Sequence, residues 1–365
     1  MNEQFHRDGV SVWGDSRRRY PLFECGEQFH WDGAVVWVSG ATGAWGQEFC
    51  RQLLAKPISK LVAFARGEHR AAALAEALHD DRLRVHLGDI RDRHLLRTSL
   101  AEASVVIHLA ALKRVDSAAF SPFEAASVNI DGTRAVIESV LALPLGTRPA
   151  RCLYLSSDKA CMPTTFYGAT KYIAEQLWLG ANVHSPRPHA PWFVAARSGN
   201  ALGSTGSVLE IWRRQFDRGQ PLTITDPGMT RFVMSLPSAV RQLLNWLGDV
   251  PGGSPAHPGE LYIQDPVAVT VGDLAEAFAP GYPTQIIGSH GQGEKRDEMM
   301  SVNGPSSAEL GRRLSVHELR IRLNTLGLLP PTPGAVDLAA HGFGFGAGPA
   351  KREEASHDPA CLWAF

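Results

Sequence analysis

The sequence predicts an α/β fold in which a doubly wound parallel sheet carries a smaller C-terminal lobe. Three observations support this prediction. Strand-like apolar runs alternate with amphipathic helical stretches from Ala34 to Arg197, the first run leads into a glycine-rich turn, and the alternation ends after Arg197. Such alternation is typical of parallel sheets with helices on both faces. The 365 residues suffice for one such domain and a lobe.

Six apolar runs are the predicted strands. Their polarity is continuous rather than alternating, which is typical of strands that helices cover on both faces. The runs are residues 35–38, 61–65, 84–87, 105–110, 152–156 and 192–196. Because a helical stretch follows each of the earlier runs, we expect a Rossmann-type domain.

The composition excludes several classes of protein. The formal net charge is −1, from 36 basic and 37 acidic residues, so no overall field attracts nucleic acid or an anionic membrane. No apolar run reaches the roughly 18 residues of a membrane span, and the first residues lack the apolar segment of a signal peptide. The five cysteines are scattered and never in C-x-x-C spacing, which argues against disulfides and a metal site. We expect a cytoplasmic protein with a small-molecule partner.

A glycine-rich turn, SGATGAWG, joins the first predicted strand to the first helix. Its G-x-x-G-x-x-G spacing lets the backbone approach a pyrophosphate, which free N–H groups at the helix N-terminus then hold. Three glycines can also form a mere turn, but the position between strand and helix favours a dinucleotide site. The expected contacts are Gly40, Thr42, Gly43, Ala44, Trp45 and Gly46.

Arg66 bears on which dinucleotide binds. It follows the second strand, where NAD-binding enzymes usually carry an Asp or Glu for the ribose 2′-hydroxyl. A guanidinium there can hold a 2′-phosphate, so the sequence favours NADP over NAD, with a solvated arginine as the alternative. The ends of the third and fourth strands should line the rest of the nucleotide, although small residues there also suit packing. These residues are Asp89, Ile90, Ala110 and Ala111.

Tyr167 and Lys171 form a Y-x-x-x-K pair after the fifth strand. Residues i and i+4 share a helix face, so the ammonium can lie beside the phenol. A phenol with a pKa of about 10 becomes a usable base near neutrality only when a close cation stabilises the phenolate. The spacing therefore predicts a catalytic pair that also contacts the dinucleotide, with an exposed helix pair as the alternative.

Ser157, Asp158 and Lys159 come directly before this pair. The chain has only seven lysines, and lysine loses its proton more readily than arginine when buried or near another cation. We expect burial and the Lys171 cation to lower the pKa of Lys159, and desolvation to keep Asp158 protonated. An exposed turn ion pair is the alternative. His108, inside an apolar strand, is predicted to be a satisfied core histidine.

The motifs SGATGAWG, HLAALKRV, VNIDGT, SSDKA, YGATK, RSGNALGS-GSV, MTRF and GQGEKRDEM resemble those of a known enzyme family. It comprises the C5-inverting UDP-N-acetylglucosamine 4,6-dehydratases of the polysaccharide-biosynthesis family, which are extended short-chain dehydrogenases/reductases. The resemblance covers roughly residues 34–300. It implies that Ser157 takes a Thr or Ser position and Asp158 is the acid. It also implies that Lys159 is a second base and that Tyr167 with Lys171 is the redox pair.

The resemblance also implies a reaction without net oxidation. Tyr167 takes the 4-hydroxyl proton while hydride leaves C4 for NADP; Lys159 then removes the acidified C5 proton, and Asp158 protonates the leaving 6-hydroxyl. Return of hydride to C6 and of a proton to C5 gives a 4-keto-6-deoxy sugar with inverted C5. The resemblance further implies a homo-oligomer, at least a dimer, through helices beside the tyrosine. Residues expected to bind substrate are Lys113, Asn200, Ser207, Val208, Arg231 and Glu294.

Three positions depart from the family pattern and leave the nucleotide and sugar open. Thr205 stands where an Arg is common, Glu210 replaces a Pro, and Gly291 replaces the Arg of R-P-G-E-K. The loss of a guanidinium removes a contact to the diphosphate, for which Arg197 and Arg231 are candidate replacements.

Two other functions compete with a dehydratase. A nucleotide-sugar 4-epimerase or dehydrogenase on the same fold needs Tyr167 and Lys171 but not Asp158 and Lys159. A non-catalytic dinucleotide-sensing protein would need none of the four residues.

The predicted organisation has four parts: an N-terminal extension at 1–33, a dinucleotide-binding Rossmann domain at 34–200, a substrate-binding lobe at 201–300 with some chain crossing back to the sheet, and a C-terminal extension at 301–365. The last part should hold a helix near 314–326 and a mobile tail. QFHRDGVSVW at 4–13 nearly recurs as QFHWDGAVVW at 28–37, which suggests a short duplication that adds an edge strand.

Overall fold

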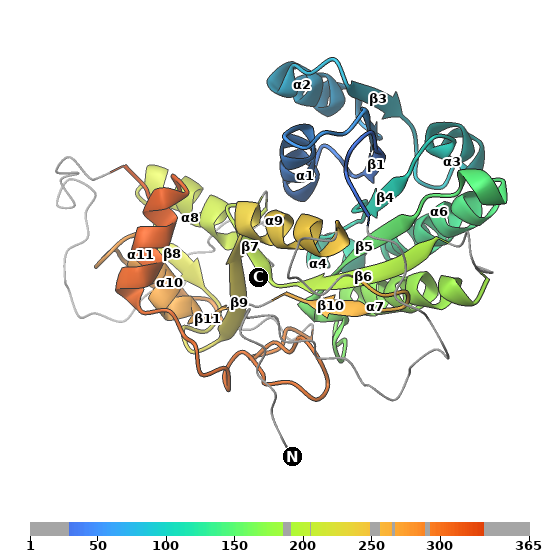
Figure 1. The fold of residues 1–365 in the computed structure, drawn as a ribbon. Helices are drawn as coiled ribbons and strands as arrows, with labels where there is room; N and C mark the ends of the chain where they lie inside the picture. The colour runs from blue at the N-terminus through green and yellow to red at the C-terminus, as the bar shows by residue number, and fades with distance from the viewer. Residues whose placement is uncertain are drawn as a thin grey trace, which may run out of the picture.

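The computed structural model describes residues 29–184, 191–204, 206–248, 256–264, 267–288 and 293–331. The first copy of the repeat, Thr205, Gly291 and the C-terminal tail lie outside these ranges. Figure 1 shows a central sheet flanked by helices, with a lobe carrying α8, α10 and α11 beside it.

Seven parallel strands form the central sheet in the order β10-β6-β5-β4-β1-β2-β3. Their bounds are β1 Val35–Ser39, β2 Lys60–Ala65, β3 Leu83–Leu87, β4 Val105–His108, β5 Arg151–Ser157, β6 Trp192–Ser198 and β10 Leu261–Ile263. The six predicted strands and the doubly wound fold are confirmed, and β10 is the chain that returns from the 201–300 segment. The strand order reverses between β1 and β4, and ligands bind at such a crevice in doubly wound sheets.

Helices cover both faces of this sheet (Figure 1). One face carries α1 Ala44–Leu54, α2 Glu68–Leu78 and α9 Leu236–Leu247, and the other carries α3 Arg93–Leu100, α6 Gly132–Leu141 and α7 Phe166–Gly180. Successive strand residues enter opposite cores: Val36 and Val38 pack under α1, and Trp37 packs on the other side. The continuous apolar runs of the sequence follow from this arrangement, because both faces are buried.

Short helical segments connect the larger elements. They are α4 Val115–Phe120, α5 Pro122–Ala126, η1 Ser127–Asp131, η2 Leu145–Thr147, η3 Asp158–Ala160 and η4 Ala181–His184. η1 is a π-helical turn that continues into α6, and η3 is a 3₁₀ turn directly after β5. η3 therefore lies at the carboxyl edge of the sheet.

The outer lobe is built around two small sheets, β11-β9-β7 and β12-β8. Its elements are β7 Asn200–Leu202, α8 Val208–Asp217, β8 Leu222–Ile224, β9 Thr230–Ser235, β11 Val267–Thr270, α10 Val271–Phe278, β12 Thr284–Ile286 and α11 Val316–Thr325. α11 confirms the helix predicted near 314–326, and Ser315 and Glu318 form a capping box at its start. Leu319 and Leu323 pack into the core of the lobe, so the described part of residues 301–365 is integral to it.

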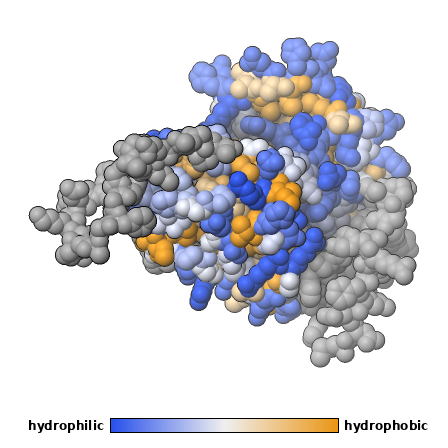
Figure 2. All heavy atoms as spheres, turned by 90° about the vertical axis from the view of Figure 1, so that its left-hand side faces the viewer, coloured by the Kyte–Doolittle hydropathy of each residue, from blue (hydrophilic) through white to orange (hydrophobic). Residues whose placement is uncertain are grey.

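Figure 2 shows the side of the molecule that the outer lobe forms, where hydrophilic residues predominate and hydrophobic residues gather in separate patches. Ile286 and Ile321 are among the exposed apolar side chains of this lobe. No helix within the described ranges is long and apolar enough to span a membrane. Cys50, Cys152 and Cys161 are buried free thiols.

Candidate active site

The glycine-rich turn has the backbone geometry that a pyrophosphate requires. Gly40 has φ +65°, and a Cβ there would lie 2.9 Å from the backbone nitrogen of Ala110. A Cβ on Gly46 would lie 2.3 Å from the carbonyl oxygen of Gly40. α1 follows Gly43 without a side-chain cap and without an acidic residue in its first turn. Free N–H groups and the helix dipole thus favour an anion, so these residues fit the pyrophosphate of a dinucleotide.

Arg66 lies at the carboxyl end of β2 with a side chain that is 73% exposed, and its Nη1 is 4.0 Å from Oε1 of Glu124. A second guanidinium contacts the same carboxylate: Arg91 Nη1 lies 3.0 Å from Glu124 Oε2. Arg91 also donates to Asp89 at 2.7 Å, and these hydrogen bonds lower the pKa of Asp89. The sequence prediction missed Arg91, although its place just after Asp89 and Ile90 was a usable signal.

Of the other residues predicted to bind the dinucleotide, some line a cavity and some lie in the core. Ala111 lines the large cavity described below, and the Ala110 N–H donates to Ser39 Oγ at 3.2 Å. Ile90 is a buried core residue on which Gly132 packs closely. Ile90 therefore supports the crevice from inside.

His108 is a core residue, as predicted. Its ring is fully buried, with Nδ1 2.7 Å from Ser39 Oγ and Nε2 3.0 Å from Thr133 Oγ1. Burial lowers the pKa of His108 to about 3, so the ring stays neutral. It connects β1, β4 and α6 rather than carrying chemistry.

α7 brings the tyrosine and its lysine to the carboxyl edge of the sheet. Thr165 caps the helix by accepting from the Gly168 N–H. A Cβ on Gly168 would lie 2.3 Å from the carbonyl oxygen of Lys159. The glycine in YGATK thus allows α7 to pack directly on η3, which places Tyr167 beside Asp158 and Lys159.

Lys171 has a different environment from the one expected. Its Nζ donates to the carbonyl oxygen of Leu155 at 2.7 Å and lies 4.0 Å from the centre of the Tyr154 ring. Burial lowers the pKa of Lys171 to about 7, against the effect of Glu175. Burial also raises the pKa of Tyr167 to about 12, with Lys159 and a Ser157 hydrogen bond opposing. The predicted lowering of the phenol pKa is therefore wrong for the free protein.

Asp158 and Lys159 form a buried ion pair with 3.3 Å between Nζ and Oδ1, and their side chains are only 1% and 14% exposed. The alternative of an exposed turn pair is excluded. Ser157 Oγ donates to Asp158 Oδ1 at 2.8 Å. Burial raises the pKa of Asp158, and Glu298 adds to this effect, so the predicted direction is confirmed.

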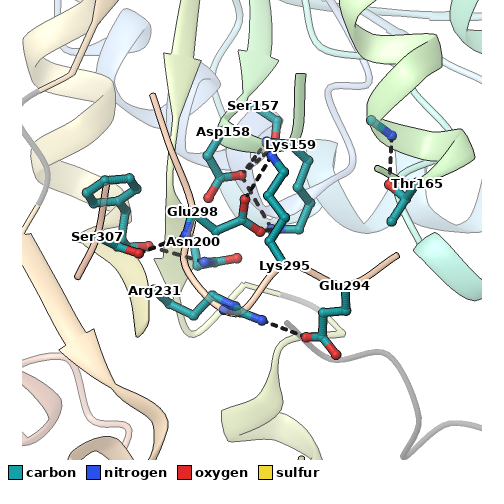
Figure 3. A network of polar contacts seen from close by, with 12 residues as sticks. Ser157, Asp158, Lys159, Thr165, Asn200, Arg231, Glu294, Lys295, Glu298 and Ser307 are labelled. Carbon is teal, nitrogen blue, oxygen red and sulfur yellow. Dashed lines mark hydrogen bonds and ion pairs between the residues drawn. The ribbon is translucent and has the colours of Figure 1, made fainter. Parts of the chain in front are cut away.

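The predicted shift in the pKa of Lys159 has the wrong direction. Burial alone would lower it, but the carboxylates of Asp158 and Glu298 raise the pKa of Lys159 to about 12. Glu298 Oε1 lies 3.5 Å from Lys159 Nζ, and Lys295 Nζ lies 3.5 Å from Glu298 Oε2 (Figure 3). GQGEKRDEM is one of the motifs identified in the sequence. Its second half contacts η3, a contact that the sequence does not indicate because the two segments are far apart in the chain.

A cavity of about 230 Å³ lies between the sheet edge and the outer lobe. Its wall includes Ser157, Lys159, Tyr167 and Lys171 from the catalytic segments and Trp45 from the glycine-rich turn. Four of the predicted substrate residues also line it, namely Lys113, Asn200, Ser207 and Val208. Lys159, Tyr167 and the glycine-rich turn thus face one space, and Asp158 adjoins it through its ion pair with Lys159.

Lys113 lines this cavity, and the charge of Glu210 acts on it. Desolvation lowers the pKa of Lys113, and the charge of Glu210 opposes this effect. The Glu210 carboxylate accepts from the Gly206 N–H at 2.5 Å, at the start of α8. An acidic side chain therefore already uses one donor near this helix N-terminus.

Arg231 and Glu294 do not line this cavity but form an ion pair of 2.7 Å, and Glu294 lines a smaller cavity with Lys159 and Glu298. The Arg231 side chain is fully enclosed, and the structure does not bring it into the large cavity. Arg197 is likewise committed, because its guanidinium donates to both oxygens of Glu175 at 2.9 and 2.7 Å. In this conformation neither arginine replaces a missing diphosphate contact.

Comparison with known proteins agrees with this geometry. A family model described as polysaccharide biosynthesis protein matches residues 36–313. A UDP-N-acetylglucosamine 4,6-dehydratase (inverting) of Campylobacter jejuni is 34% identical over 266 residues, which cover 72% of this chain and 76% of that protein. A UDP-glucose 4-epimerase of Rickettsia conorii is 30% identical over 271 residues, with 72% and 76% covered.

A solved structure shows the same fold. The dTDP-glucose 4,6-dehydratase DesIV of Streptomyces venezuelae, crystallised with NAD and TYD bound, aligns with a TM-score of 0.63 at 20% identity, over 81% of this chain and 98% of that one. The family match covers the Rossmann domain and most of the outer lobe. The chain therefore belongs to the polysaccharide biosynthesis protein family.

Proposed function

We propose that the protein is a nucleotide-sugar 4,6-dehydratase that acts on UDP-N-acetylglucosamine or a related nucleotide sugar. The observation that carries this proposal is the buried Asp158–Lys159 ion pair, whose lysine lines the same cavity as Tyr167. Oxidation at C4 needs a base and a hydride acceptor, whereas loss of water across C5–C6 also needs an acid and a second base. The Campylobacter relative is a UDP-N-acetylglucosamine 4,6-dehydratase (inverting), which supports the same reaction.

The side chains divide the steps between them. A bound nicotinamide dinucleotide supplies a hydride acceptor for C4 and a hydride donor for C6. The phenolate form of Tyr167, whose own proton has passed to solvent, accepts the proton of the 4-hydroxyl, and the resulting ketone makes the C5 proton acidic. Lys159 Nζ removes that proton, and Asp158 donates a proton to the 6-hydroxyl, which leaves as water. A proton then returns to C5 from the opposite face.

As an ion pair, Asp158 and Lys159 have the opposite charge state from the one that elimination needs. An ammonium and a carboxylate face each other across 3.3 Å, whereas elimination needs an amine and a carboxylic acid. Transfer of one proton from Lys159 to Asp158 converts the first state into the second, and elimination regenerates the ion pair. A sugar that displaces water favours the neutral form, because unsolvated charges are costly.

Turnover in deuterated water tests this function. The protein is incubated with NADP⁺ and UDP-N-acetylglucosamine, and the sugar is followed by proton NMR. We expect a new 6-methyl signal, deuterium at C5 and inverted C5 stereochemistry. A C4 epimer without dehydration would instead support a 4-epimerase, which the Rickettsia relative favours. An unchanged sugar with retained dinucleotide binding contradicts the substrate and requires a panel of nucleotide sugars.

We further propose NADP rather than NAD as the dinucleotide. Arg66 and Arg91 lie at the ends of neighbouring strands, and both are within 4.0 Å of Glu124, so two guanidinium groups can turn to a 2′-phosphate. Arg66→Ala should weaken NADP⁺ binding about tenfold and leave NAD⁺ binding unchanged, as measured by calorimetry. Equal losses for both dinucleotides would contradict the assignment.

The start of α8 is our proposed diphosphate site. Ser207 and Val208 open this helix at the cavity wall, and Lys113 lies across from them. Backbone N–H groups of a helix N-terminus bind phosphate well. The Gly206 N–H, just before this helix, already donates to Glu210, so the Glu210 carboxylate competes with a diphosphate for this donor, which sets this chain apart from relatives with a proline there.

We propose a homo-oligomer that forms through α4, α5 and α7. These helices contact one another and expose Phe120, Phe123, Tyr172, Ile173 and Leu177. Phe120 and Phe123 are 84% and 91% exposed, which is unusual for side chains of this size unless a partner covers them. Phe123→Asp should yield a smaller species in sedimentation, and an unchanged mass would contradict this surface.

A further inference from the structure

One segment, residues 293–300, joins the outer lobe to the catalytic turn. On the lobe side, Thr230 forms a bridge with Asp297, and Ser307 Oγ accepts from the Glu298 N–H at 2.8 Å. On the sheet side, Thr164 donates to the carbonyl oxygen of Gly293, and Lys295 donates to that of Cys161 at 2.5 Å. The segment therefore fixes the distance between the two halves of the cavity.

Close packing explains why the segment can reach the catalytic turn. Gly293 has φ +80°, and a Cβ there would lie 2.1 Å from the carbonyl oxygen of Thr164. Only glycine permits this approach. The approach in turn brings Glu298, which is almost fully buried, to within 3.5 Å of Lys159 Nζ.

We propose that Glu298 is a positioning residue for the elimination step: with Lys295 as its counter-ion, it holds the Lys159 amine against Asp158 and governs where their shared proton resides. This inference rests on the proposed dehydratase function and concerns the same site. Figure 3 shows Lys159 between the carboxylates of Asp158 and Glu298, with Lys295 beside Glu298.

The geometry gives the two carboxylates different roles. Buried Asp158 Oδ2 and Glu298 Oε2 both lack a hydrogen-bond partner among the described residues, but Glu298 Oε2 lies 3.5 Å from Lys295 Nζ, which leaves Asp158 Oδ2 as the oxygen that can carry a proton. Glu298 instead faces the ammonium groups of Lys159 and Lys295. Burial alone would raise the pKa of Glu298, but Lys159, Arg231 and Lys295 hold it below its ordinary range. Glu298 therefore remains the permanent anion of the cluster.

A permanent anion acts on both partners of the pair. It disfavours a second negative charge on Asp158, which keeps this carboxyl protonated when the amine is neutral. Its ion pair with Lys159 also limits rotation of the amine and stabilises the ammonium that forms when the C5 proton is taken. Tyr167 and Arg231 are the other ionisable groups that act electrostatically on Lys159.

Glu298→Gln tests this role because it removes the charge and keeps the shape. We expect kcat for dehydration to fall by about 10- to 100-fold, within the range that acid–base catalysis contributes. KM and the formation of reduced dinucleotide in a single turnover should stay unchanged. Glu298→Asp should recover part of the loss. Equal loss of C4 oxidation and dehydration, or no loss of either, would overturn the proposal.

Asp226→Asn is the matched control. Asp226 pairs with Arg296 of the same segment at 3.8 Å, but its side chain is half-exposed and lies outside the cavity. Removing its charge tests whether any weakened tether of the segment slows dehydration. We expect wild-type rates, and a loss equal to that of Glu298→Gln would assign both effects to the tether and contradict a role for the Glu298 charge.

A titration separates this inference from the proposed function, since it needs no turnover. The chain has seven lysines, so ¹³Cε-lysine NMR is tractable, and Lys159→Arg identifies the resonance. Loss of an opposite charge at this range should lower the pKa of Lys159 by about one unit in Glu298→Gln. An unchanged pKa would refute the inference even if the wild-type protein dehydrates the sugar. A lowered pKa in a protein that dehydrates no sugar would leave the charge coupling intact and refute the dehydratase.

Discussion

Two buried lysines of the same cavity differ in charge state because their neighbours differ. Lys159 lies between the carboxylates of Asp158 and Glu298, and these raise its pKa to about 12. Lys171 contacts a backbone carbonyl and the face of Tyr154, and burial lowers its pKa to about 7. Both ammonium groups lose hydration, and Glu175 offsets this only in part at Lys171, whereas Lys159 has two carboxylates within 3.5 Å. Both lysines are buried, so the difference between their pKa values comes from the charged groups beside them.

The largest expected effect separates the two lysines by chemical step. Lys159→Met should reduce dehydration by about 10²- to 10⁴-fold while reduced dinucleotide still forms in a single turnover, because the residue acts only at C5. Lys171→Met should suppress formation of the reduced dinucleotide itself. Stopped-flow absorbance and product NMR check both expectations. If both variants stop at the same step, the comparison fails.

The second prediction is a stability change of opposite sign. Lys159→Met leaves the buried Asp158 without its cation and Glu298 with Lys295 alone as ion-pair partner, and should lower the free energy of unfolding by about 3–5 kcal/mol. Lys171→Met removes a poorly solvated ammonium and should raise it by roughly 1–3 kcal/mol, the gain being reduced by the lost hydrogen bond.

Urea unfolding of the dinucleotide-free protein measures both changes. Lys60→Met is the control, because Lys60 pairs with the exposed Glu102 and should change stability by less than about 1 kcal/mol. Destabilisation by Lys171→Met would show that its amine is better stabilised than its neighbours indicate.

The smallest effect is a dependence of stability on pH. The folded-state pKa of Lys171 is about 7 and its ordinary value is 10.5, so the unfolded chain binds more protons between these values. The free energy of unfolding should therefore gain a contribution that grows as pH rises from about 7 to 10. Lys159 has a raised pKa, and its stabilising contribution is lost only above 10.5.

Comparison of the wild-type protein with Lys171→Met isolates this contribution. The stability advantage of the variant should shrink steadily between pH 7 and 10, as followed by urea midpoints at each pH. An advantage that stays constant over this window would contradict the lowered pKa of Lys171.

Local patterns carried most of the fold prediction. The six apolar runs became strands because each is buried on both faces, and the glycines at 40 and 46 became close-contact positions that no larger residue can occupy. The helix near 314–326 followed from its periodicity, and the structure adds a capping box at its start. Periodicity could not show where this helix packs. The structure shows that Leu319 and Leu323 lie in the core of the outer lobe.

Residue identities also placed Ser157, Asp158, Lys159, Tyr167 and Lys171 in one site, because Y-x-x-x-K fixes a helix face and SSDKA directly follows a strand. Sequence reasoning erred on the pKa values of Lys159 and Tyr167. It attributed both pKa shifts to the Lys171 cation. Instead, Asp158 and Glu298 together outweigh burial at Lys159 and raise its pKa, and burial raises the pKa of Tyr167. Arg231 and Arg197 were expected at the substrate, but each is held by a buried carboxylate.

The sequence by itself determined the doubly wound sheet, the dinucleotide turn and the residues that can carry a dehydration. These depend on local backbone preferences and on spacing within one strand or helix. Only the tertiary structure decided which charges meet, because Glu298 and Lys159 are far apart in the chain and come within 3.5 Å through the packing of Gly293 against Thr164. Electrostatic interaction depends on distance in space, and the order of residues along the chain does not specify that distance.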